Sequence, residues 1–93
     1  MQFVKYLRDA VRSGAVTCTF RIWTRPHVTE GKRYRMEDGF IEIDEVARIT
    51  LDDITPKLAR ASGFRNVSDL LALAKHGRGE NVYLIRFHYI PPN

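Results

Sequence analysis

The chain has a single cysteine, Cys18, and no long apolar stretch. One cysteine cannot form an internal disulfide, and without a neighbouring cysteine it cannot supply a metal-binding or redox pair. No segment approaches the roughly 20 apolar residues that span a bilayer, and the first residues lack the apolar core of a secretory signal. We therefore expect a cytoplasmic protein in a reducing compartment, with no membrane partner.

Two kinds of ligand-binding motif are also missing. No glycine-rich phosphate loop of the G-x-G-x-x-G kind follows a predicted strand. The three histidines, His27, His76 and His88, are far apart, and none has the short spacing to another ligand that is typical of zinc sites. The sequence thus predicts no cofactor and no metal.

What is present is the composition of a globular protein. Hydrophobic residues make up 44% of the 93 residues, and they include five Phe, four Tyr and one Trp, which is enough to fill one core. A chain of this length has no room for a second core. We expect residues 1–93 to form a single domain, and no oligomeric state is predicted.

Charge is unevenly distributed along the chain. Residues 21–35 contain five basic side chains and one acidic side chain, whereas residues 37–53 contain seven acidic side chains and one basic side chain. A basic block can attract phosphates, because each cation placed against a phosphate releases counterions. The alternative is that these charges are the solvated ends of strands.

Hydrophobic periodicity predicts an α+β fold. The 3.6-residue pattern of an amphipathic helix and the alternation of strands place helices at 3–13, 56–62 and 66–77 and strands at 17–23, 32–36, 40–50 and 81–90, with a turn at 78–80. We expect the sheet to curl into a barrel around Phe20, Ile22, Ile41, Ile43, Ile85 and Phe87.

Four segments resemble the motifs of ASCH domains, which belong to the PUA-like superfamily. The segment Gly14-Ala15-Val16-Thr17-Cys18-Thr19-Phe20-Arg21 is similar to the family pattern G-x-K-T-x-T-x-R, and residues 31–34, 49–55 and 82–87 agree with it in order and spacing. The resemblance implies a small PUA-like curled β-barrel with an N-terminal helix, a two-helix insert before the last strand, and a cleft beside the first strand. It also implies RNA or a nucleotide-like ligand as the partner.

The same resemblance raises an enzymatic alternative. Some small bacterial ASCH proteins deacetylate acetylcytidine with a lysine, a threonine and a carboxylate. Here Thr19 matches the threonine, but Val16 stands in the lysine position and Ser62 falls near the carboxylate position. Because two of the three catalytic groups are missing, the sequence does not decide whether the chain is an enzyme. The alternative is an RNA-directed hydrolase, either a divergent acetylcytidine amidohydrolase or a metal-independent ribonuclease, with Thr19 as its catalytic residue.

The best candidate binding residues lie on the first predicted strand. Alternation places Thr17, Thr19, Arg21 and Trp23 on one face, where hydroxyls can donate to phosphate, a guanidinium can grip it and an indole can stack on a base. The alternative is an ordinary outward sheet face. Further candidates for a basic rim around that face are Arg25, His27, Lys32, Arg33 and Arg35, although alternation places Arg33 and Arg35 on the opposite side from Lys32. On the last strand, Arg86 and His88 form a polar pair that can line a pocket; the alternative is a strand edge that leaves the core.

Glu42, Asp44 and Glu45 form an acidic strip on the third predicted strand. Two nearby carboxylates can act as an acid and a base in catalysis. The interpretation that we favour is a solvated sheet face that balances the basic strand beside it.

Overall fold

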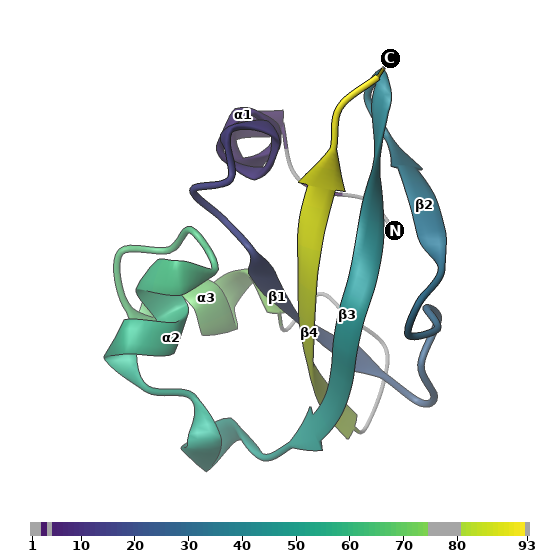
Figure 1. Cartoon of the computed structure of the whole chain (residues 1–93). Helices are drawn as coiled ribbons and strands as arrows, with labels where there is room; N and C mark the ends of the chain where they lie inside the picture. The colour runs from purple at the N-terminus through teal and green to yellow at the C-terminus, as the bar shows by residue number, and fades with distance from the viewer. Residues whose placement is uncertain (1–2, 4, 75–80, 93) are drawn as a thin grey trace.

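The computed structural model describes residues 3, 5–74 and 81–92. Its elements follow the chain in the order shown in Figure 1. They are α1 (Lys5–Ser13), β1 (Cys18–Trp23), β2 (Arg33–Met36), β3 (Gly39–Ile49), the 3-10 helix η1 (Leu51–Asp53), α2 (Pro56–Ala61), α3 (Val67–Ala74) and β4 (Asn81–Ile90). This order confirms the predicted α+β class. The predicted helix end at 75–77 and the turn at 78–80 lie outside the described residues.

The four strands form one antiparallel sheet in the order β1-β4-β3-β2. The long strands β3 and β4 run side by side at its centre, and β1 crosses behind them at an angle in Figure 1. α1 packs against β4, and α3 packs against β1. The sheet is thus a curled half-barrel with helices on one side and at one end.

The short helix α2 forms where the sequence supplies signals for both of its ends. Thr55 caps its start by accepting a hydrogen bond from the Leu58 backbone N at 3.1 Å, and Pro56 occupies the first turn. At its end Gly63 has φ +96° and its N–H donates to Arg60 O, while Phe64 N–H donates to Ala59 O. This pair of bonds is a Schellman motif, which needs a left-handed residue at the glycine position.

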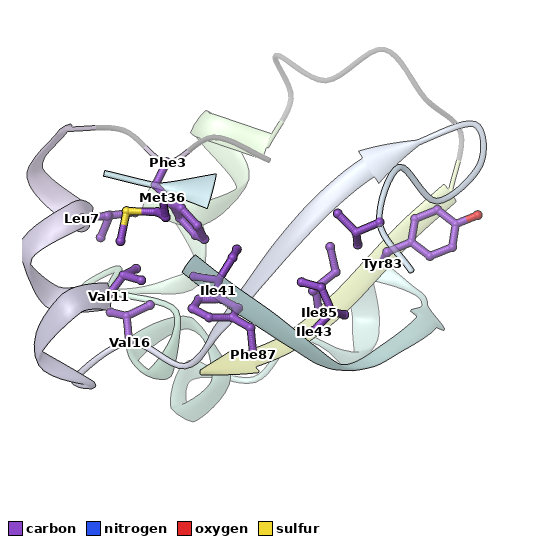
Figure 2. Close-up of a cluster of buried hydrophobic side chains, with 11 residues drawn as sticks. Phe3, Leu7, Val11, Val16, Met36, Ile41, Ile43, Tyr83, Ile85 and Phe87 are labelled. Carbon is purple, nitrogen blue, oxygen red and sulfur yellow. The ribbon is translucent and has the colours of Figure 1, made fainter. Parts of the chain in front are cut away.

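The inner face of the sheet carries the larger core. We define this face by Tyr83, Ile85 and Phe87 of β4, and Figure 2 shows the side chains gathered on it. The cluster also contains Phe3, Leu7, Val11, Val16, Val28, Met36, Ile41 and Ile43. α1 therefore closes one end of the half-barrel with its apolar side.

The outer face, which carries Val82, Leu84, Arg86 and His88, is covered over only part of its length. α2, α3 and the segment before them enclose a second cluster there of Cys18, Phe20, Ile54, Ala59, Leu70, Val82 and Leu84. The prediction that Phe20 and Ile22 share a core with Ile41, Ile43, Ile85 and Phe87 is wrong. Phe20 belongs to the second cluster and Ile22 packs against it.

The β-register explains this division. Phe20 lies opposite Leu84 and Ile22 opposite Val82, whereas Thr19 lies opposite Ile85. Directly opposed residues of an antiparallel pair point to the same face. Both faces are covered along β1 and along the part of β4 that pairs Leu84 and Val82 with it, so alternation alone could not tell which set of side chains points into the half-barrel.

A β-bulge in β3 shifts the alternation of this strand. Ile43 lies opposite Phe87 and Glu45 lies opposite Arg86, so Asp44 is the extra residue. Val46 then returns to the inner face opposite Ile85, and its backbone N–H donates to Glu30 Oε2 at 2.9 Å. The bulge keeps both Asp44 and Glu45 exposed.

None of the helices in the described ranges is long and apolar enough to cross a membrane.

Two glycines with positive φ differ in their surroundings, and this difference makes a stability test. A Cβ on Gly63 would lie 2.5 Å from Leu7 Cδ2, whereas a Cβ on Gly14, at φ +84°, would meet nothing within 4 Å. We expect Gly14→Ala to cost about 1 kcal/mol from backbone strain alone. Gly63→Ala adds a clash inside the core and should cost about 2–4 kcal/mol. Urea unfolding of both variants measures the difference, and equal losses would contradict the packing described for Gly63.

Candidate functional site

Three of the predicted binding residues lie on the inner face of β1. Thr19, Arg21 and Trp23 share this face because Thr19 lies opposite Ile85 and Arg21 opposite Tyr83. Thr19 is buried, with 8% of its surface exposed, and Arg21 and Trp23 are partly exposed. Thr17 precedes the strand and is exposed, and its carbonyl accepts a hydrogen bond from Phe87 N–H at 2.9 Å. The face is shared as predicted, but it points into the half-barrel.

Arg21 brings a positive charge to this inner face. Its guanidinium carbon lies 5.3 Å from the centroid of the Phe3 ring, which is within the range of a cation–π contact. Burial lowers the pKa of the Arg21 guanidinium. Arginine nevertheless stays protonated at neutral pH because its ordinary pKa is so high, so Arg21 is a cation held at the edge of the core.

An aromatic group lies at the end of β1 beyond Arg21. The rings of Trp23 and His27 are stacked, with centroids 4.5 Å apart and planes inclined by 14°, and the Tyr83 ring lies 6.1 Å from that of Trp23. His27 is exposed and Trp23 is half-buried. Asn81 holds the start of the following loop, since its Nδ2 donates to Thr24 O at 2.9 Å. We refer to Trp23, His27 and Tyr83 as the aromatic group.

Two basic residues on the connection from β1 to β2 have their charges available to a ligand. Arg25 and Lys32 are both exposed, and within the described part of the chain neither forms an ion pair. The connection is anchored against β3, because Gly31 N–H donates to Ile43 O at 2.7 Å and Ile43 N–H donates to Lys32 O at 3.0 Å. A fixed loop thus carries these cations.

The remaining predicted basic residues lie on the outer face and are already engaged. Arg33 Nε donates to Glu42 Oε1 at 3.1 Å, and Arg86 Nε lies 3.4 Å from Glu45 Oε1. The Arg35 guanidinium lies over the Phe40 ring, 5.8 Å from its centroid. Arg33, Arg35 and Arg86 are therefore separated by the sheet from Arg21 and Trp23. The predicted binding residues therefore do not form one continuous site.

Sequence reasoning missed a polar cluster that strand pairing creates on the outer face. His88 lies opposite Glu42 in the register, and its Nδ1 is 2.9 Å from Asp44 Oδ1. Its Nε2 lies 3.6 Å from Glu42 Oε2. A search for ligands close in sequence could not find this cluster, because His88 is on a different strand from the two carboxylates. The signal that could have found it was pairing of the acidic strip with the last strand.

The positions that an ASCH-type amidohydrolase would use for catalysis are occupied by core residues. Val16 is buried with 4% of its surface exposed, and a Cβ on Gly63 would lie 3.2 Å from its Cγ2, so the β1 approach and the end of α2 adjoin. Ser62 is buried, and its hydroxyl donates to Ala59 O at 2.8 Å. The two segments meet, but they present a methyl group and an internally bonded hydroxyl in place of a lysine and a carboxylate.

Comparisons with family models, with curated proteins and with solved structures gave no match. The chemistry of both surfaces is therefore inferred from their own residues.

The buried thiol of Cys18 on β1 makes stability depend on pH. Burial raises the thiol pKa in the folded protein, and Arg86 opposes this in part. The unfolded thiol ionises near pH 8.5, so the folded state loses stability as the pH rises above about 8.5. We expect the free energy of unfolding to fall less steeply with alkaline pH in Cys18→Ala than in the original protein. Urea unfolding at several pH values measures this, and parallel curves would contradict it.

Proposed function

We propose that the chain is a non-catalytic binding module for RNA or a nucleotide-like ligand, with the aromatic group as its stacking surface. The observation that carries this proposal is the parallel stack of Trp23 and His27, which extends a half-buried indole with an exposed ring. Stacking of a base on an aromatic side chain contributes about 1–3 kcal/mol and tolerates any base. A flat aromatic surface of this kind suits an unpaired base.

The charges around the aromatic group favour a ligand with phosphates. Arg21 precedes Trp23 on the same strand face, and Arg25 and Lys32 follow on the loop with no acidic partner in the described residues. Guanidinium groups bind phosphate oxygens in pairs, and a lysine contributes a point charge. Stacking for the base and cations for the backbone are the two elements of single-strand recognition.

The sequence resemblance supports the same proposal. Residues 14–21 and the three later segments follow the order of ASCH motifs, and the curled half-barrel is compatible with a PUA-like fold. We therefore propose that the chain belongs to that family, which is associated with RNA. The resemblance would place the ligand in a cleft beside β1, which is the strand that carries Arg21 and Trp23.

The hydrolase alternative has less support from the residues present. Thr19 has 8% of its surface exposed, and Val16 and Ser62 are buried in the positions of the other two catalytic groups. A general base or an activated nucleophile needs a titratable partner within hydrogen-bonding reach. Neither valine nor an internally bonded serine provides one.

The binding proposal predicts that the positive charges on the β1–β2 connection contribute more to RNA affinity than the same number of charges elsewhere on the surface. We expect Arg25→Gln with Lys32→Gln to weaken binding of short single-stranded RNA about tenfold and to reduce the slope of log affinity against log salt by roughly 1.4. Lys57→Gln with Arg60→Gln removes the same charge from exposed positions of α2 and should have little effect. Fluorescence anisotropy across a salt series measures both variants. Equal losses would indicate attraction to net charge alone and would contradict the loop assignment.

The same titration reports on stacking, because Trp23 is the only tryptophan of the chain. Its fluorescence should be quenched in parallel with the rise in anisotropy, and binding without any change in fluorescence would rule out Trp23 as the platform.

Acetylcytidine incubated with the protein should remain intact by chromatography. Deacetylation that is lost in Thr19→Val would establish the hydrolase in place of the binding module.

A further inference from the structure

The cluster of Glu42, Asp44 and His88 lies on the outer face of the sheet, away from the aromatic group. One potential ligand atom from each side chain lies within 4.8 Å of the other two. About half of the side-chain surface of His88 and Asp44 is exposed, and 31% of that of Glu42. An ion could therefore reach the cluster from solvent without any movement of the backbone.

Two features of the sheet bring these three side chains together. The β3–β4 register places His88 directly opposite Glu42, and the bulge after Ile43 leaves Asp44 exposed on the same side. Bulges often re-aim a side chain in this way. Glu42 and His88 are directly paired in the antiparallel ladder of the two central strands, and Asp44 adjoins them at the bulge.

We propose that Glu42, Asp44 and His88 form a binding site for a divalent transition-metal ion of the Zn²⁺ class. One imidazole nitrogen and two carboxylates are a ligand set that suits Zn²⁺ and its neighbours in the transition series, whereas Mg²⁺ and Ca²⁺ prefer oxygen ligands alone. Three protein ligands leave the fourth position of the ion to water.

The distances fit such an ion with small side-chain rotations. Ligand atoms around tetrahedral Zn²⁺ are about 3.4 Å apart when each bond is about 2.1 Å long. His88 Nε2 and Glu42 Oε2 are already separated by 3.6 Å. Asp44 now contacts the other ring nitrogen, Nδ1, with its two oxygens at 2.9 and 3.0 Å. Rotation of the exposed Asp44 side chain or of the imidazole would bring the third ligand into place.

Neighbouring ion pairs orient the Glu42 carboxylate and hold the Glu45 carboxylate away from the proposed metal site. Arg33 Nε binds Glu42 Oε1, which leaves Oε2 directed at His88. Arg86 forms an ion pair with Glu45, the residue that follows Asp44. Arg33 thus positions Glu42, but its charge also opposes a cation. Removal of that charge should therefore strengthen metal binding.

The test is calorimetric titration of the full 93-residue chain, without a histidine tag, with Zn²⁺. We expect one ion per chain with a micromolar dissociation constant, and at least tenfold weaker binding in His88→Gln and in Asp44→Asn. Arg33→Gln should bind several-fold more tightly than the original chain. All three positions are exposed, so the variants should fold, and circular dichroism checks this.

Matched controls separate this site from general attraction of zinc to histidines and carboxylates. His27→Gln and Asp52→Asn change the same residue types at exposed positions outside the cluster and should leave the Zn²⁺ affinity within about twofold. An excess of Mg²⁺ should not displace Zn²⁺. Equal weakening in the controls, or no saturable binding at Zn²⁺ concentrations on the order of 1 mM, would overturn the proposal.

Discussion

The pairing of β3 with β4 is the constraint on which the rest of the described structure depends. β1 pairs with the free edge of β4 and β2 with that of β3, so the register of the central pair positions all four strands. The bulge at Asp44 then decides which β3 side chains reach the core. Without it, Glu45 would point to the inner face beside Ile85, and burial of an unpaired carboxylate is strongly unfavourable. The bulge places Val46 there instead.

Incomplete covering of the outer face explains where β4 changes from apolar to polar. Val82 and Leu84 lie beneath the helices in the second cluster, and Arg86 and His88 follow where the helices no longer cover the sheet. On the inner face the apolar series Tyr83, Ile85 and Phe87 continues without a break. One strand thus contributes to two cores and to an exposed polar surface, and the second core ends where α2 and α3 no longer cover the sheet.

The elements of the fold could be predicted from the sequence, but the arrangement of the faces could not. Local signals such as the Thr55 cap and the left-handed Gly63 act within a few residues, and the structure confirms the helix that they delimit. Strand alternation separated Thr19 from Phe20 correctly but gave no means to decide which of them faced the half-barrel, since both faces are covered. The proximity of Glu42 to His88 depends on a register between residues 46 positions apart, which no local pattern encodes.

Strand pairing also changes what the uneven charge distribution means. The antiparallel β2–β3 hairpin sets Arg33 of the basic block against Glu42 of the acidic block, and β3–β4 pairing sets Glu45 against Arg86. These exposed pairs each contribute little to stability, but they neutralise charge that a count along the sequence assigns to ligand binding. Arg25 and Lys32 of the basic block form no ion pair with the described residues and lie on the loop that leaves β1, while the carboxylates of Glu42 and Asp44 gather around His88 on the outer face. Because the sheet lies between them, an anionic ligand at the aromatic group and a cation at His88 would bind to separate surfaces, and neither would neutralise the other.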